Sequence, residues 1–303
     1  MKQHRLSLST GVELDVWTQG NPANPAIIFL HGFPESHRTW RHQIAALSDR
    51  YYCIAPDQRG YRGSSKPQEV DAYTPDKLTA DIFAVADALN VQDFIVAGHD
   101  WGGAIAWSVA LNGQAGGMNP AYAGRVTGAV IANAPHPYMF QRLLITNMQQ
   151  RESSQYIRAF RDTANDALIR AEGLTGLLRK YVKWDRPECL EAEEREALLA
   201  DWQDRDACFG MINWYRAAPI VVPAMDEHAV LPAFADAGFP PLNIPALLIW
   251  AMDDLALPPS NIDGIEALVP DVTIVPVHDC GHFVIWEKPA EVNAAMRAWL
   301  ANA

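Results

Sequence analysis

Short apolar runs recur along the first 135 residues of the chain, separated by longer segments of mixed polarity. Four of these runs contain few polar residues and are bounded by Gly, Pro, Asp or Asn. Such runs are typical of parallel strands that are buried on both faces. They cover residues 26–30, 52–55, 94–97 and 126–131. The spacing between them leaves room for helices, which predicts a parallel sheet with helices on both sides.

Helix and hairpin signals occupy the segments beside these runs. Thr74 and Pro75 have the form of an N-cap followed by proline at the first helical position. Apolar residues then recur on one helical face at positions 78, 82, 85 and 89. Near the start of the chain, an alternating pattern around Leu6 and across residues 14–17 predicts an antiparallel hairpin at the sheet edge.

The pattern changes after about residue 136. From Tyr138 to about Ala235 the periodicity is mostly helical, with charge clusters over residues 188–206 and a single strand-like run at 220–223. Strand-like runs return at 246–250 and 272–277, and a final helix is expected over 289–300. We therefore expect an α/β core from residues 1–135 and 241–303, interrupted by a helical cap over residues 136–240.

Composition narrows the class of protein. With 49% hydrophobic and 20% charged residues, the chain can bury a sizeable core. Its net charge of −12 repels nucleic acid and anionic membranes, and it has no membrane-spanning run and no signal-peptide pattern, so we expect a cytoplasmic protein. The four cysteines are far apart, which favours reduced thiols over a disulfide framework or a zinc site; they are Cys53, Cys189, Cys208 and Cys280. We find no metal, nucleotide or flavin motif and expect no cofactor.

The stretch VAGHDWGG at residues 96–103 raises the question of catalysis. An acidic residue, Asp100, follows a predicted strand and precedes an apolar helix, with glycines at positions 98 and 102. Small residues two positions to either side are what a sharp strand-to-helix turn requires when its central side chain is a nucleophile. The alternative is that Asp100 only caps the helix, as acidic residues often do.

Three further segments could complete a catalytic site. FLHGFPES at residues 29–36 directly follows a predicted central strand, where backbone N–H groups could hold an oxyanion. Asp253 and Asp254 come just after a later strand, and His282 lies in a loop before the final helix. The chain order of nucleophile, acid and histidine is the order found in a known class of enzymes whose nucleophile lies at a sharp strand-to-helix turn.

These motifs resemble those of the soluble epoxide hydrolases, in an α/β-hydrolase fold with an inserted helical cap. The matching stretches are HGFPES, DQRGYRGSSKP, GHDWGG, NWYR and DCGHF, and the likeness extends from about residue 10 to the end. The resemblance implies that Asp100 is the nucleophile, that His282 is the base and that Asp254 orients it. It also implies an oxyanion hole from the backbone N–H groups of Phe33 and Trp101.

The family uses two cap tyrosines that donate to the epoxide oxygen. Tyr215, in GMINWYRA, matches the second of them, and Tyr156, in SSQYIRAF, matches the first through fewer neighbouring residues. The competing tyrosines are Tyr73, Tyr138 and Tyr181. The resemblance implies conversion of a small apolar epoxide and water into a diol, by a monomer or homodimer that uses no cofactor.

Two other functions are compatible with this scaffold. A dehalogenase would share the Asp nucleophile, but Phe33 has no side-chain donor where one dehalogenase group carries Asn. Trp101 and Ala104 also stand where haloacetate dehalogenases carry arginines. A ligand receptor on the same fold would not need Asp100, Asp254 and His282 together. We expect His37 to be a solvated helix residue, and we assign no role to the glycine-rich residues 111–126.

Overall fold

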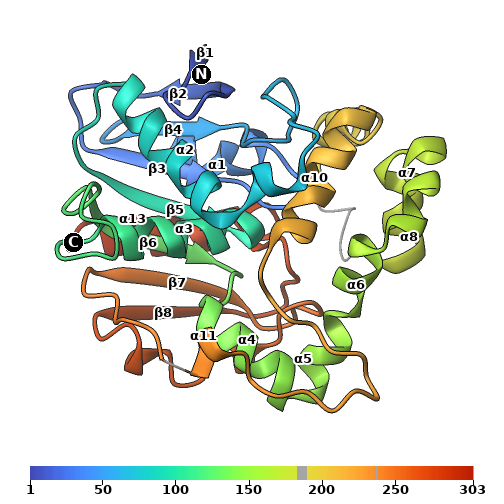
Figure 1. Cartoon of the computed structure of the whole chain (residues 1–303). Coiled ribbons are helices and arrows are strands. Elements are labelled where there is room, and N and C mark those ends of the chain that lie inside the picture. Colours follow the sequence, from blue (N-terminus) through green and yellow to red (C-terminus); the bar gives the residue numbers. More distant parts are fainter. Residues whose placement is uncertain (183–189, 237, 303) are drawn as a thin grey trace.

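The computed structural model describes residues 1–182, 190–236 and 238–302 of the chain. A single eight-stranded sheet runs through the molecule in the order β1-β2-β4-β3-β5-β6-β7-β8 (Figure 1). The first two strands form the predicted antiparallel hairpin at one edge, β2 also pairs antiparallel with β4, and β3 to β8 are parallel to one another. The strands are β1 (Lys2–Ser7), β2 (Glu13–Gln19), β3 (Ala26–Leu30), β4 (Tyr52–Pro56), β5 (Phe94–His99), β6 (Val126–Ala132), β7 (Ala246–Ala251) and β8 (Val272–Val277). The predicted fold class is therefore confirmed.

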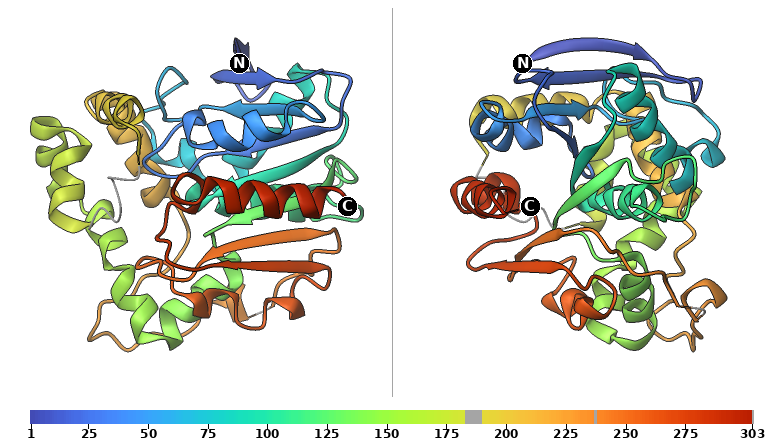
Figure 2. Two further views of the ribbon diagram at one scale, coloured as in Figure 1. Left: turned by 180° about the vertical axis from the view of Figure 1, so that it is seen from behind. Right: turned by 90° about the vertical axis from the view of Figure 1, so that its left-hand side faces the viewer.

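Helices cover both faces of the sheet because side chains alternate along each strand. On β3, Ile28 and Leu30 join one apolar cluster, whereas Ile27 and Phe29 join the other. The views in Figure 2 show helices on both faces of the sheet. The first cluster includes α2 (Pro75–Ala88) and α3 (Asp100–Gly113), and the second includes α1 (Arg41–Leu47), α12 (Val284–Glu287) and α13 (Pro289–Leu300).

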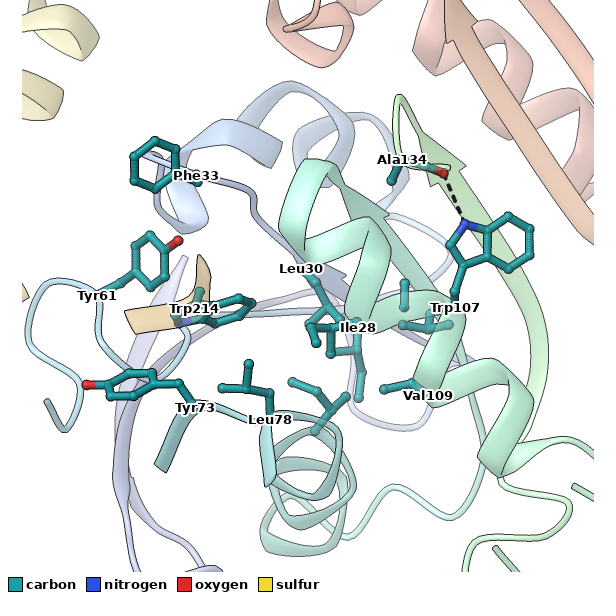
Figure 3. Packing of buried hydrophobic residues seen from close by; sticks show 14 of the residues in the cluster. Ile28, Leu30, Phe33, Tyr61, Tyr73, Leu78, Trp107, Val109, Ala134 and Trp214 are labelled. Atoms are coloured by element: carbon teal, nitrogen blue, oxygen red, sulfur yellow. Dashed lines mark hydrogen bonds between the residues drawn. The ribbon is translucent and has the colours of Figure 1, made fainter. Parts of the chain in front are cut away.

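Large aromatic side chains fill the first cluster, as Figure 3 shows. Trp107 of α3 is fully buried, and its indole nitrogen donates a hydrogen bond of 3.0 Å to the carbonyl oxygen of Ala134. Trp214 lies at the opposite end of this cluster, next to Tyr61. Its indole nitrogen donates to the carbonyl oxygen of Arg59 at 2.9 Å. Each indole thus keeps its polar atom satisfied while burying the ring.

The short 3-10 helices lie at loops and helix starts. They are η1 (His37–Trp40), η2 (Val70–Tyr73), η3 (Thr163–Asn165), η5 (Pro259–Ile262) and η6 (Ile265–Ala267). The start of α2 is as predicted, with Thr74 at the N-cap and Pro75 at the first helical position. The Thr74 side chain makes no capping hydrogen bond there. Proline's fixed φ angle and missing N–H therefore account for this helix start.

Between β6 and β7 the chain leaves the sheet and forms a series of helices, which line one side of the molecule in Figure 1. They are α4 (Pro137–Thr146), α5 (Met148–Ser153), α6 (Gln155–Arg161), α7 (Asp166–Glu172), α8 (Leu174–Tyr181), α9 (Ala192–Asp201), α10 (Arg205–Ala217) and α11 (Ala233–Asp236). The strand-like run at 220–223 forms no strand. Its backbone bonds instead to side chains of Gln141, Arg158 and Arg161.

The structure also bears on the expectations for the cysteines, for His37 and for membrane-spanning helices. Cys53, Cys208 and Cys280 are buried, and Cys189 lies outside the described residues. His37 is not solvated: it is 3% exposed, and its Nδ1 lies 2.9 Å from a carboxylate oxygen of Asp57. No helix in the described ranges has both the length and the apolar character needed to cross a membrane.

The glycine-rich stretch after α3 joins two distant parts of the chain. The side chain of Gln114 donates to the carbonyl oxygen of Pro241 at 3.0 Å and accepts from the backbone N–H of Asn243 at 2.7 Å. Tyr122 stacks on Phe83 of α2 with 3.8 Å between the ring centroids. This stretch therefore holds the segment that leads back into β7.

Candidate active site

Asp100 occupies a sharp turn between β5 and α3. Its φ angle is 52°, in the left-handed region that side chains rarely adopt. A Cβ atom at Gly98 would overlap the carbonyl of Gly102, and one at Gly102 would overlap the backbone of Leu30. Glycine is therefore required at both places. The helix-cap alternative does not hold, because His99 occupies the N-cap position and Asp100 is the first helical residue.

His282 joins two carboxylates that come from distant parts of the sequence. Its Nε2 lies 3.3 Å from Oδ2 of Asp100, and its Nδ1 lies 2.7 Å from Oδ2 of Asp254. Asp254 follows β7, and His282 lies in the loop between β8 and α12. The structure thus brings together the three residues that the sequence singles out, with Asp254 rather than Asp253 beside the imidazole.

Asp254 is held by several donors. The side-chain nitrogen of Asn133, at the end of β6, donates to Oδ2 at 2.7 Å. The backbone N–H groups of Ala256 and Leu257 donate to Oδ1 at 2.8 and 3.0 Å. Burial acts to raise the pKa of this carboxyl, but His282 and these hydrogen bonds outweigh it and lower the pKa. The carboxylate therefore stays ionised although it is buried.

The charge on His282 depends on its two partners. Burial acts to lower the pKa of the imidazole, whereas Asp254 and Asp100 raise it, and the result lies well above the ordinary value. The ring in this state is protonated and bridges two anions. Removal of the negative charge on either carboxylate would lower the pKa of His282.

One of the predicted oxyanion donors already contacts Asp100. The backbone N–H of Phe33 donates to Oδ1 of Asp100 at 2.6 Å. Trp101 is the second residue of α3, so its backbone N–H belongs to the first helical turn, where no carbonyl of the helix can accept it. Phe33 lies in the loop after β3, and Trp101 lies just after β5. The role of Trp101 as an oxyanion donor stays a prediction.

The two cap tyrosines line the same cavities as Asp100. Tyr156 lies on α6 and Tyr215 on α10, with 6.0 Å between the ring centroids. The ring of Tyr215 packs edge-on against Phe33 and Trp101, at 5.0 Å from each. Burial, with the charge of Asp100 added, raises the pKa of both phenols far above the ordinary value. Both hydroxyls therefore remain protonated and able to donate.

The competing tyrosines are engaged elsewhere. The hydroxyl of Tyr73 donates to the carbonyl of Pro67 at 2.8 Å, and that of Tyr138 accepts from Arg142 at 3.1 Å. Tyr181 does line the larger cavity, but its hydroxyl donates to the side chain of Asn165 at 2.8 Å. Among these tyrosines, Tyr156 and Tyr215 are therefore the pair that shares both cavities with Asp100.

Two cavities of unequal size share Asp100, Tyr156 and Tyr215 in their walls. The larger has a volume of about 500 Å³ and is also lined by His282. The smaller has a volume of about 90 Å³, and most of its remaining lining is apolar, including Trp101. A substrate whose reacting carbon lies at Asp100 would thus have one substituent on each side.

A buried acid and a histidine behind this site were not singled out from the sequence. Glu35 accepts from Nδ1 of His99 at 2.8 Å and from the indole nitrogen of Trp286 at 2.8 Å. Nε2 of His99 lies 2.8 Å from the carbonyl oxygen of His282. Both partners of the His99 ring are oxygen atoms that can accept a hydrogen bond. Their positions inside the HGFPES and GHDWGG motifs were the available signal.

The Glu35 carboxyl has a strongly shifted pKa. Burial acts to raise it, but the charge of His99 and hydrogen bonds from His99, Thr39 and Trp286 lower it to about 2. The acid is therefore ionised at neutral pH. Together the pair supports the backbone of the loop that carries His282. Within the described ranges, no group of three or more acidic, His or Cys side chains is arranged to hold a metal ion.

Comparison with known proteins now identifies the class. The family model described as alpha/beta hydrolase fold matches residues 25–289, so the chain belongs to the α/β-hydrolase fold family. It is 32% identical to AB hydrolase superfamily protein YfhM of Bacillus subtilis, over 97% of this chain and 96% of that protein. It is 28% identical to epoxide hydrolase A of Mycobacterium tuberculosis, over 98% of this chain and 97% of that one.

Solved structures place it within one branch of that family. A structure described under novel epoxide hydrolases in metagenomes from hot environments is 60% identical, with a TM-score of 0.92, and the match covers 100% of this chain and 99% of that one. An epoxide hydrolase from Bacillus megaterium in complex with a diol product is 29% identical, with a TM-score of 0.83 and coverage of 99% and 100%. The resemblance to the epoxide hydrolases is confirmed.

Proposed function

We infer that this protein is an epoxide hydrolase, which converts an epoxide and water into a vicinal diol. The observation that carries this function is the position of Asp100. Its carboxylate lies between the imidazole of His282 and the N–H of Phe33, and it lines cavities whose walls carry Tyr156 and Tyr215. A nucleophile and acids that share one cavity are what ring opening at carbon requires.

In the first step we assign Asp100 as the nucleophile. A carboxylate oxygen attacks one carbon of the epoxide, the bond from that carbon to the ring oxygen breaks, and an alkyl ester forms. The departing oxygen gains negative charge and takes a proton from Tyr156 or Tyr215. Because the phenol of Tyr215 is buried and that of Tyr156 is partly buried, their hydrogen bonds are stronger than they would be in water.

In the second step we assign His282 as the base. Ester formation removes the negative charge of Asp100, so the pKa of the imidazole falls and the ring releases its proton, which restores the phenol that lost one in the first step. The neutral ring then takes a proton from water, which attacks the carboxyl carbon of the ester while Asp254 stabilises the imidazolium that forms. The N–H groups of Phe33 and Trp101 hold the oxyanion. The bond from the carboxyl carbon to the ester oxygen then breaks, that oxygen takes the second proton of the attacking water, and the diol leaves with Asp100 again ionised.

Replacement of the base tests the two-step scheme. In His282→Gln the first step should proceed and the second should stall, so intact-protein mass spectrometry should show the added mass of one epoxide. Peptide mapping should place that mass on the peptide that contains Asp100. The matched control is His278→Gln, at an exposed histidine, which should turn over without an adduct. A folded His282→Gln protein that gains no mass from styrene oxide would refute the scheme.

A dehalogenase with the same nucleophile is the second candidate function. Trp101 lines the smaller cavity beside Asp100, where its side chain could contact a leaving halide. Phe33 supplies only a backbone donor. A side-by-side assay of an aryl epoxide, a bromoalkane and fluoroacetate distinguishes the two functions by diol release and halide release.

We also propose that the helices between β6 and β7 act as a cap, with boundaries near residues 136 and 240. They supply both tyrosines, whereas the nucleophile, base and acid come from the flanking core segments. A cytoplasmic location and a monomeric or homodimeric state are proposed from the sequence. Size-exclusion chromatography with light scattering tests the oligomeric state.

A further inference from the structure

The unequal cavities decide where the larger substituent of a substrate lies. A dry cavity of about 150 Å³ is known to bind benzene, and the smaller cavity here has a volume of only about 90 Å³. The larger cavity, of about 500 Å³, is in the range of typical ligand sites. A phenyl-sized or longer substituent must therefore occupy the larger cavity, and the lining of that cavity governs which chemical group it can carry.

A carboxylate lies on the wall of this larger cavity. Glu152 is on α5, four positions before Tyr156, and both side chains line the cavity. Glu152 is exposed to solvent, and its side chain forms no ion pair or hydrogen bond with any described residue. Ser153 lines the same wall. No Lys or Arg occurs among the described residues that line this cavity.

Arg151 and Arg161 form no ion pair with Glu152, because their guanidinium groups bond to backbone carbonyls elsewhere. The guanidinium of Arg151 is buried and donates to the carbonyl oxygens of Leu144, Ile145 and Glu227. The guanidinium of Arg161 donates to the carbonyl oxygens of Tyr215, Ala218 and Ile220. These cations stabilise the backbone of the cap helices and connecting segments. Neither guanidinium therefore contacts the carboxylate of Glu152 at the cavity wall.

We propose that Glu152 makes the enzyme select epoxides whose larger substituent is uncharged or cationic, and reject those that carry a carboxylate. This inference rests on the proposed function and names the substrate class of the same site. A carboxylate on the substituent would approach Glu152 and be repelled, while a cation would be attracted. Because Glu152 is exposed to water, the effect is that of a screened surface charge and not of a buried ion pair.

Three terminal epoxides of one chain length provide the test. They end in trimethylammonium, in hydroxyl or in carboxylate, and kcat/KM is measured for each by diol release. Glu152→Gln removes the proposed determinant. Glu196→Gln is the matched control, because it changes the net charge equally at an exposed position on α9 that does not line the cavity. All measurements are made at low and at high salt.

In the unchanged protein we expect the cation to be favoured over the carboxylate. Glu152→Gln should lower that ratio about two- to fivefold, with the alcohol unaffected, and high salt should reduce the difference. Glu196→Gln should leave the ratio unchanged. An unmoved ratio in Glu152→Gln, or equal changes in both variants, overturns this inference alone. If the unchanged, folded protein does not hydrolyse the alcohol, the proposed function fails and the inference fails with it.

Discussion

The two halves of the site differ in how the chain holds them. The core half comprises Asp100, Asp254 and His282: Asp100 directly follows β5, Asp254 lies in the loop after β7, and His282 lies in the loop between β8 and α12. Paired strands fix the backbone directly before Asp100 and shortly before Asp254. The cap half, as proposed above, comprises Tyr156 and Tyr215, which lie on two separate helices, α6 and α10.

Docking contacts replace the sheet in the cap half. The indole of Trp214 donates to the carbonyl of Arg59, and that of Trp202 donates to the carbonyl of Pro34 at 2.9 Å. Arg38 holds Glu194 of α9 by two hydrogen bonds of 2.8 Å each. The proposed nucleophile, base and orienting acid are thus held next to the sheet. The two tyrosines that would contact the substrate instead lie on helices whose position depends on tertiary packing.

The largest expected effect is loss of the nucleophile from the core half. Asp100→Asn should lower turnover of an aryl epoxide by at least about a thousandfold, because an amide cannot form the ester. Diol release measures the rate, and intact mass checks that the asparagine is retained. If the folded variant keeps most of its activity, Asp100 is not the nucleophile and the core half loses its assigned chemistry.

A second prediction concerns the buried pair behind His282. The folded pKa of Glu35, about 2, lies below its ordinary value, so its ionised form stabilises the fold above about pH 4.5, and this stability is lost as the pH falls toward 2. Glu35→Gln should lower the free energy of unfolding by about 3 kcal/mol at neutral pH. Urea unfolding across the pH range measures the difference, which should shrink in acid.

Glu196→Gln is the control for this variant, since it removes an exposed carboxylate. Its unfolding midpoint should follow that of the unchanged protein at every pH. A Glu35→Gln protein that shows the same acid dependence as the unchanged protein would contradict the assignment of that dependence to Glu35.

The third prediction tests the cap half. Tyr215→Phe should slow formation of the alkyl-enzyme about tenfold to a hundredfold, because one hydrogen bond to a developing charge is lost while Tyr156 remains. Single-turnover kinetics measures this step. Tyr181→Phe is the matched control, since that hydroxyl is bonded to Asn165. Equal rates in the two variants would remove Tyr215 from the proposed role.

The smallest expected effect is on docking of the cap. Glu194→Gln breaks the paired contact with Arg38 and should weaken attachment of α9 by up to about 1 kcal/mol. Hydrogen exchange should become faster in α9 and remain unchanged in β5, and added salt should diminish the difference. Faster exchange in both elements would show that the contact supports the whole fold and not the cap alone.

The same contrast explains what could be predicted from the sequence. Strand β3 and helix α13 follow from local patterns, and Asp100 could be placed because its neighbouring glycines mark a turn. The buried state of His37 and the Glu35–His99 contact could not be predicted in this way. Each depends on side chains far apart in the sequence, and a polar residue carries no periodic signal for burial. The positions of Tyr156 and Tyr215 likewise depend on helix docking, for which only the resemblance gave guidance.

The segment between β6 and β7 leaves and re-enters the sheet on adjacent, directly paired strands. Its two attachment points are therefore close together, and the sheet order does not depend on how many residues lie between them. A differently sized set of helices could be inserted there without a change in the strand order of the sheet. Recombination at these two points would exchange the cavity wall together with Tyr156 and Tyr215, and would leave Asp100, Asp254 and His282 in place.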